Sequence, residues 1–238
     1  MTPTADECSF CRNRAPERFC ELAGITPSPA SGVFTVSSCR PRQILFGEGN
    51  PSLAVYCILS GIVKVYKTGS KGEPLIIRLL GPGELVGYRA VLAREPYAAT
   101  AEAVGDVTVC VIPADKILEL LRVSSEFCQR MLLKLSRELL TSEEQMMALA
   151  QETVRARTLR MLVSFLDKAG GELRVGGLLP VPLQRSEIAQ MVGTSPETLS
   201  RTLRRLAHEE ILQVTRTEIF IRDAARLRSL RRNPPRAT

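Results

Sequence analysis

A stretch without glycine or proline runs from Ser125 to Ala150 and constrains the fold more than any other part of the chain. It consists of strong helix formers, so we expect a single helix about 39 Å long at ~1.5 Å per residue. Its apolar residues recur at alternating steps of three and four, with a serine completing the series: Leu132, Leu135, Leu139, Ser142, Met146 and Leu149. This spacing is typical of a heptad seam that pairs with a second helix. A core helix lying on its own domain is the alternative.

The 238 residues suffice for two domains flanking this helix. We expect a cysteine-bearing segment over residues 1–32, a β-rich domain over 33–123, the dimerisation helix over 124–150 and a basic domain over 151–238. The first ten residues are acidic and lack the apolar segment of a secretory signal. No apolar run approaches the ~18 residues that a membrane span needs. The expected protein is soluble and cytoplasmic, without a membrane partner.

The net charge of +7 is unevenly distributed along the chain. Residues 1–150 hold 16 basic and 16 acidic side chains, whereas residues 151–238 hold 16 basic and 9 acidic ones. An excess confined to one half indicates a domain that binds a polyanion. A solvated basic surface without a ligand is the competing interpretation.

Three of the seven cysteines lie close together near the start, as Cys8 and Cys11 in a C-x-x-C pattern followed by Cys20. Such clustering indicates metal ligands or redox thiols, because a reducing compartment disfavours disulfides. An iron–sulfur cubane needs four thiolates, so a fourth cysteine would have to come from elsewhere. Zinc bound by the same sulfurs and unrelated reduced thiols are the alternatives.

Short apolar runs alternate with glycine turns from Val33 to Pro113. Turn signals at this regular spacing predict an antiparallel β-barrel or jelly roll. With the long helix and the helix-rich basic half, the predicted fold class is α+β.

The basic half contains a short helical segment over Gln184–Gly193 and a second over Thr194–Leu206. Two helices joined at a glycine predict a helix-turn-helix, and two short runs over 211–214 and 218–221 predict a wing hairpin. Ser195 before Pro196 is a good start signal, although Thr194 with Glu197 could instead form a capping box. On the second helix, Leu199, Leu203 and Leu206 are expected to face inward and Glu197, Ser200, Arg201, Arg204 and His208 outward.

Polar groups at the start of such a helix are placed to reach base edges in the major groove. Arg201 is suited to a bidentate bond to guanine, and Glu197 to accepting from a cytosine amino group. A helix cap and a solvated surface arginine are the plainer roles of these two residues. Further arginines are candidates for phosphate contacts: Arg185, Arg204, Arg205, Arg216 and Arg222.

Three segments of the β-rich half resemble the effector domain of the CRP/FNR regulators: residues 61–66 (GIVKVY), 81–87 (GPGELVG) and 98–103 (AATAEA). Residues 197–201 (ETLSR) resemble the E-x-x-S-R signature of the FNR branch. The resemblance implies a cyclic-nucleotide-binding-like β-roll, a long dimerisation helix and a winged helix-turn-helix. It also implies a homodimer that binds double-stranded DNA at a TTGAT–N4–ATCAA palindrome, acts with RNA polymerase and is not an enzyme.

Residues 108–113 (TVCVIP) resemble the segment that supplies the fourth cluster ligand in that branch. The resemblance implies an oxygen-labile [4Fe–4S] cluster on Cys8, Cys11, Cys20 and Cys110, with Cys39 as the substitute for Cys20. Cys57 and Cys128 are expected to be packing residues.

No cyclic nucleotide is expected, because Ala99 and Thr100 stand where the nucleotide-sensing branch has an arginine followed by serine or threonine. Ser142 stands where enteric members have an acidic residue that keeps the cluster-free form apart, so serine opposes pairing less.

The main alternative is the same scaffold without iron, responding to thiol oxidation, haem, nitric oxide or another small effector. A redox enzyme that uses the cysteines is a third hypothesis, disfavoured because the chain has no glycine-rich cofactor motif.

Overall fold

A computed structural model of the chain describes residues 34–70, 72–168, 177, 183–215, 218–223, 225–227 and 229. The chain divides into two compact units, Met1–Arg137 and Glu138–Thr238. The division falls inside helix α5, Ser125–Gln151, which confirms the single long helix expected from the sequence.

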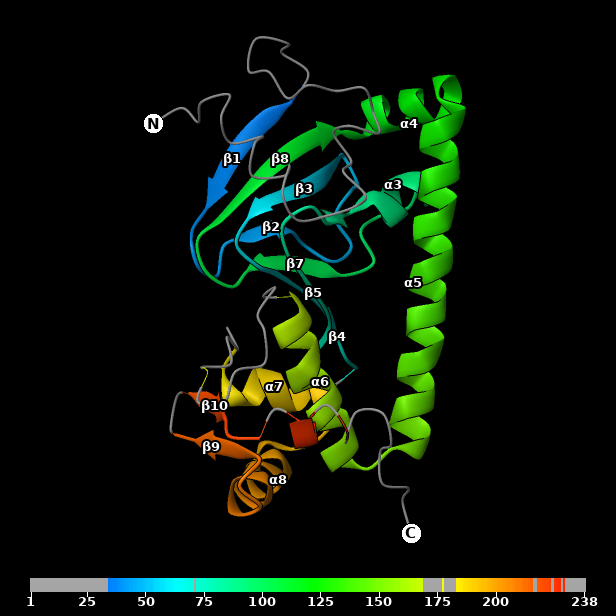
Figure 1. Ribbon diagram of the computed structural model, residues 1–238. Helices are drawn as coiled ribbons and strands as arrows, with labels where there is room; N and C mark the ends of the chain where they lie inside the picture. The colour runs from blue at the N-terminus through cyan, green and yellow to red at the C-terminus, as the bar shows by residue number, and fades with distance from the viewer. Residues whose placement is uncertain are drawn as a thin grey trace. The chain divides into compact units, whose positions relative to one another are not determined.

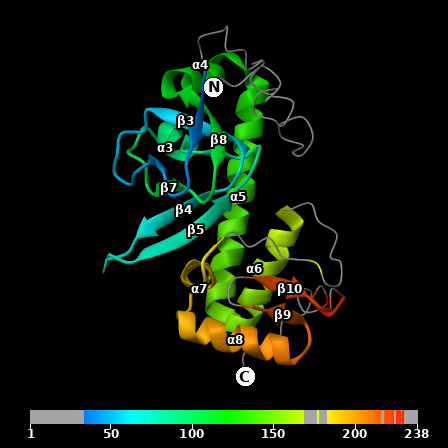
Figure 2. The same ribbon diagram turned by 90° about the vertical axis from the view of Figure 1, so that its left-hand side faces the viewer.

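The described residues of the first unit form two four-stranded antiparallel sheets, in the orders β1-β8-β3-β6 and β2-β7-β4-β5 (Figure 1). The predicted antiparallel β-roll is therefore confirmed. Figure 2 shows β4 and β5 as neighbouring strands that project from this unit as a hairpin. The strands are β1 (Thr35–Cys39), β2 (Ile44–Phe46), β3 (Ala54–Ser60), β4 (Val63–Thr68), β5 (Pro74–Leu80), β6 (Leu85–Val86), β7 (Thr100–Ala103) and β8 (Val107–Pro113).

Alternating side chains from the two sheets fill the interior of the roll. Val63 and Val65 of β4 are buried there, whereas Lys64 between them is only half-buried. Ile58 of β3 and Val109 of β8 belong to the same apolar cluster. This alternation is the period of two that a strand imposes on its side chains.

The opposite face of the β1-β8-β3-β6 sheet is also covered. Helices α3 (Tyr88–Ala93) and α4 (Ala114–Val123) and the first turns of α5 contribute to a second apolar cluster on this face. The sequence pattern did not reveal α3 and α4, because six or ten residues give too few turns for periodicity to show. The buried members of this outer cluster are Val55, Cys57, Leu59, Leu85, Tyr88, Val91, Cys110, Ile112, Ile117, Phe127 and Met131.

In the described part of the second unit, the elements after α5 include helices and a two-stranded sheet. They are α6 (Val154–Lys168), α7 (Arg185–Val192), α8 (Pro196–His208), β9 (Leu212–Val214) and β10 (Ile219–Ile221). Together α7, α8 and the β9–β10 hairpin confirm the helix-turn-helix and the two strands expected after it.

Local chemistry sets the helix boundaries in this unit. The Thr153 hydroxyl accepts a hydrogen bond from the Ala156 amide (3.2 Å) and caps α6, which begins at Val154. Gly193 ends α7 with φ of +69°, a left-handed conformation that glycine adopts without strain. The Ser195 hydroxyl accepts from the Thr198 amide and caps α8, so the alternative capping box of Thr194 with Glu197 is wrong.

Candidate functional site

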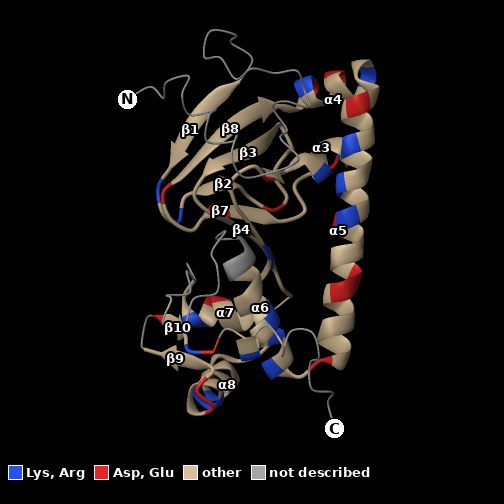
Figure 3. Cartoon of the chain, in the orientation of Figure 1, with Lys and Arg blue, Asp and Glu red and all other residues tan. Residues whose placement is uncertain are grey.

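Helix α8 presents one apolar and one polar face. The three leucines expected to face inward, Leu199, Leu203 and Leu206, are at most 2% exposed, which confirms their orientation. Glu197, Arg201, Arg204 and His208 are exposed, whereas Ser200 is half-buried. The colouring of Figure 3 shows that α8 contains both basic and acidic residues.

The exposed groups at the start of α8 are held in a short chain of polar contacts. Arg201 Nη2 donates to the Thr198 hydroxyl at 3.0 Å, and the Ser195 hydroxyl lies 3.2 Å from the same oxygen. The pKa of Glu197 is below its ordinary value, first because its carboxylate accepts from its own backbone amide, then from Ser195, and because Arg201 is near. Glu197 is therefore an ionised acceptor at neutral pH, and Arg201 is a donor with four further N–H groups available.

Arg185, expected to contact phosphate, lies in a different environment. It is half-buried, and its Nη2 donates to the carbonyl oxygens of Thr215 (3.1 Å) and Glu218 (3.4 Å). These carbonyls flank the turn between β9 and β10. Burial lowers the pKa of its guanidinium. The structure thus assigns Arg185 to holding the hairpin, a role that sequence reasoning missed because both acceptors lie some thirty residues further along the chain.

Helix α5 exposes a broad apolar face. Among the residues of the predicted seam, Leu132, Leu139, Met146 and Leu149 are more than half exposed. Leu135 instead packs against the outer cluster of its own unit. A neighbouring row that the heptad pattern did not include is equally exposed: Leu133, Leu140 and Met147.

Ser142 lies on the exposed face of α5, within the predicted seam. Its hydroxyl donates to the Glu138 carbonyl at 2.8 Å, so the polar group is satisfied within the helix itself. Such a residue can face a partner helix without leaving a donor unpaired, although it contributes little apolar area.

Cys110 lies on β8 and is 2% exposed, within the outer cluster. Its cross-strand neighbour on β1 is Val36, and Phe34 packs against the same cluster. Cys8, Cys11 and Cys20, the other expected cluster ligands, lie outside the described residues. In sequence, these cysteines precede β1, the strand that pairs with β8.

The other described cysteines divide between the two faces of this sheet. Cys39 belongs to the interior cluster, and burial raises the pKa of its thiol. Its side chain thus lies on the opposite face from Cys110, which argues against Cys39 as the third ligand. Cys57 is the direct partner of Cys110 across the β3–β8 ladder and lies in the same cluster. Cys128 is half-buried on α5.

The roll also contains a small cavity of about 60 Å³. Phe46 and Tyr97 stack beside it with ring centroids 3.8 Å apart, and the Tyr97 hydroxyl donates to the Ala54 carbonyl at 2.6 Å. Ala99 is part of its lining, and so are Arg78 of β5 and Arg89 of α3.

Two family models match the chain, a cyclic nucleotide-binding domain over residues 36–124 and a Crp-like helix-turn-helix domain over residues 156–230. Both matches coincide with the structures just described. The chain belongs to the CRP/FNR family of transcription regulators. As a CRP/FNR regulator it binds DNA through the helix-turn-helix.

Several relatives of this CRP/FNR chain are regulators. The transcriptional activatory protein AadR of Rhodopseudomonas palustris is 27% identical over 80% of this chain and 78% of its own length. A cyclic AMP receptor protein of Thermus thermophilus is 29% identical over 78% of this chain and 83% of its own. An anaerobic regulatory protein of Pasteurella multocida is 28% identical over 79% of this chain and 68% of its own.

The fold of this CRP/FNR chain also matches solved structures. FixK2 from Bradyrhizobium japonicum superposes with a TM-score of 0.73 and 26% identity, over 83% of this chain and 97% of that one. In the part of the chain that the structure describes, no three His, Cys, Asp or Glu side chains are grouped to hold a metal ion. None of the helices described is both long and apolar enough to cross a membrane.

Proposed function

We propose that this CRP/FNR regulator is a homodimer that binds an FNR-type palindrome, TTGAT–N4–ATCAA, with one α8 in each half-site. The support is the exposed pair Glu197 and Arg201, whose types match a cytosine amino group and a guanine edge. The same two residues belong to the ETLSR segment that resembles the FNR signature. RNA polymerase is the expected protein partner.

Pairing is proposed to occur along α5. Leu132, Leu139 and Met146 repeat at intervals of seven and are all more than half exposed. An exposed apolar row of this length is unfavourable in water and is typical of a helix that packs against a second copy. The adjacent row of Leu133, Leu140 and Met147 widens the face available to the partner.

DNA binding is proposed to depend on an oxygen-labile [4Fe–4S] cluster held by Cys8, Cys11, Cys20 and Cys110. The residues present fit such a group in two respects. Cys110 lies opposite Val36 of β1, the first described strand after the other three cysteines in the sequence. From Cys20 to Val36 the chain can span up to about 50 Å, so its length does not limit the approach.

One observation carries the coupling between such a site and the dimer helix. Cys110 shares its apolar cluster with Phe127 and Met131, which are 0% and 5% exposed at the start of α5. A bound cluster supplies a centre that ties four thiolates together until oxygen degrades it. As a ligand of such a group, Cys110 would link β8 to the other three cysteines, and the packing of Phe127 and Met131 would follow the position of β8. The position of the first turns of α5, and with it the pairing of two α5 helices, would thus depend on the cluster.

A regulator without iron is the second candidate, and the cavity favours it. Arg78 and Arg89 line that cavity and suit an anionic effector. The Thermus thermophilus relative is described as a cyclic AMP receptor protein, so a nucleotide is one such anion. As it stands the cavity admits only a few water molecules at about 10–15 Å³ each, so Phe46 and Tyr97 would have to move for a larger ligand.

Anaerobic purification separates the two candidates. We expect iron and acid-labile sulfide in equal amounts, near four of each per chain for a [4Fe–4S] cluster, and a broad visible absorption that bleaches in air. The same sample should sediment as a dimer and bind the palindrome before exposure to air, and lose both properties afterwards. Iron-free protein that binds the palindrome only after addition of cyclic AMP would instead support the second candidate.

A further inference from the structure

The end of α5 packs directly against the turn of the helix-turn-helix. A Cβ atom added at Gly193 would lie 2.8 Å from Leu149 Cδ2, closer than packed carbon atoms approach. Ala148, one residue earlier, is 5% exposed. Gly193 of the α7–α8 turn therefore lies too close to Leu149 of the last turn of α5 for any larger residue. Both segments belong to the second compact unit.

Arg157, one turn into α6, links three separate segments of this unit. Its Nε donates to the Val192 carbonyl (2.8 Å) and its Nη2 to the Gly193 carbonyl (3.2 Å). Its Nη1 donates to the carbonyl of Glu152, the residue that follows α5 (2.6 Å). Carbonyls at a helix carboxyl end lack partners within the helix and carry partial negative charge, so a planar cation with several donors satisfies them well.

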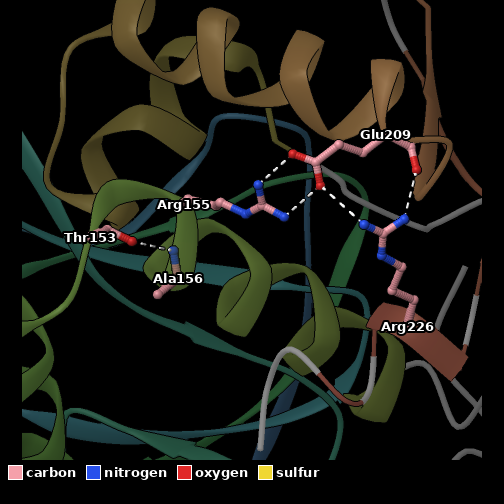
Figure 4. Close-up of polar contacts among 5 residues, drawn as sticks. All are labelled: Thr153, Arg155, Ala156, Glu209 and Arg226. Carbon is pink, nitrogen blue, oxygen red and sulfur yellow. Dashed lines mark hydrogen bonds and ion pairs between the residues drawn. The ribbon is translucent and has the colours of Figure 1, made fainter. Parts of the chain in front are cut away.

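Arg155, two residues earlier, holds the carboxyl end of α8 (Figure 4). Its Nη1 and Nη2 donate to the two carboxylate oxygens of Glu209 at 2.5 and 2.6 Å, and Glu209 is the residue that ends α8. Arg226 donates to the Glu209 backbone carbonyl at 3.1 Å. A bidentate pair fixes orientation as well as distance. The end of α7 and the carboxyl end of α8 are thus both held from the first turn of α6.

The corner between α5 and α6 is itself well fixed. Arg160 forms an ion pair with Glu152, and the Thr153 hydroxyl caps α6 through the Ala156 amide. The connection consists of Glu152 and Thr153, and each of these residues binds a residue of α6. These contacts restrain the angle between the two helices.

We propose that Arg157 and Arg155 are positioning residues that make the carboxyl-terminal half of α5 and the helix-turn-helix move as one rigid body. The inference rests on the proposed function, because it concerns how a dimer presents two α8 helices to DNA. Pairing of α5 helices then fixes the separation and relative rotation of the two recognition helices. The spacing of half-sites is set by Arg157 and Arg155 as well as by the helix seam.

The test measures spacing selectivity of the full-length protein, prepared anaerobically. Fluorescence anisotropy gives the affinity for TTGAT–N4–ATCAA and for the same half-sites separated by N3 and N5, each of which rotates one half-site by about 34°. The wild type should prefer N4 strongly. Arg157→Ala should reduce the N4 preference about tenfold. Arg157→Lys should have nearly the same effect, because an ammonium group cannot donate to all three carbonyls in the geometry of the guanidinium.

Arg122→Ala, at the exposed end of α4, removes the same charge elsewhere and should keep the wild-type preference. A general loss of stability would weaken all three duplexes alike and would not change their ratio. A folded Arg157→Ala protein with an unchanged ratio would overturn the inference.

A measurement without DNA keeps the inference separate from the proposed target. The amides of Gly193 and Thr194 donate to the Gln190 and Ala189 carbonyls at 3.0 Å. Hydrogen exchange at these two amides should become at least severalfold faster in Arg157→Ala, together with exchange at the end of α5. If the wild type does not bind the palindrome, the proposed target is wrong. The exchange result alone then tests whether Arg157 holds α5 and the helix-turn-helix together. Unchanged exchange in both segments would refute it.

Discussion

Cys57 and Cys110 are direct partners across the antiparallel β3–β8 ladder, and both side chains are buried in the cluster that α5 helps to cover. Directly opposed residues in such a ladder have Cα atoms about 4.5–5.5 Å apart. Two sulfurs therefore lie on the face that was expected to supply one. Only Cys110 has a counterpart in the family segment, so the pair raises a specific question about which sulfur binds iron.

Cysteine substitutions answer that question. Cys110→Ser should lose most of the iron and sulfide of anaerobically purified protein, because an alcohol is a poor ligand for iron in a cluster. Cys57→Ser should keep the full complement, and Cys39→Ser, on the opposite face of the sheet, serves as the matched control. Iron and sulfide analysis of the three proteins is the measurement. Equal loss in Cys57→Ser and Cys110→Ser would mean that the sheet supplies two ligands.

The seam of α5 makes a second prediction. Ser142→Leu should shift the cluster-free protein toward the dimer and allow it to bind DNA, since each leucine buried on pairing contributes roughly 1.5–3 kcal/mol. Analytical ultracentrifugation under air measures the shift. Gln145→Leu adds the same apolar area at an exposed position outside the seam and should leave the equilibrium unchanged. Persistence of the monomer in Ser142→Leu would contradict pairing along this face.

Local sequence signals predicted the elements of this structure better than their contacts. The long helix and the recognition helix follow from helix formers, spacing and the Ser195–Pro196 start, all of which act within a few residues. Contacts between distant segments leave no such signal. The register that places Cys57 opposite Cys110, the packing that takes Leu135 out of the seam, and the acceptors of Arg185 all depend on tertiary structure.

The contact of Arg185 with the hairpin predicts an unusual effect on DNA binding. Arg185→Ala should weaken binding of all sequences, because the β9–β10 turn loses its anchor, yet the dependence of affinity on salt should barely change. Arg204→Ala, an exposed arginine of α8, should reduce the salt slope by about 1 if it contacts phosphate. Binding measured over a range of salt concentrations compares the two. A reduced slope for Arg185→Ala would make Arg185 a direct phosphate contact after all.

The exposed guanidinium of Arg201 predicts a change in sequence preference. Arg201→Ala should cost about 1–3 kcal/mol on the intact palindrome and relax discrimination at a single base position in each half-site. Competition assays with duplexes carrying each single substitution measure this. Thr198→Val removes the hydroxyl that accepts from Arg201 without removing the cation, and should cause a smaller loss at the same position. A uniform loss over all duplexes would assign Arg201 to the backbone instead.

The Arg155–Glu209 pair predicts a dependence of stability on acid. The pKa of Glu209 is below its ordinary value of 4.5, chiefly because its carboxylate accepts hydrogen bonds from Arg155. A carboxyl whose pKa is lower in the folded state stabilises the fold above the unfolded pKa, and this contribution is lost as the pH falls through the folded value. Wild type should therefore be more stable than Glu209→Gln at neutral pH, and the difference should shrink below pH 4.5.

Urea unfolding of both proteins across this pH range, followed by helix content, measures the difference. Glu210→Gln removes the exposed carboxylate of the neighbouring residue and is the matched control. A constant difference between wild type and Glu209→Gln at every pH would mean that the contribution of Glu209 does not depend on its charge. Its pairing with Arg155 would then not be what holds the end of α8.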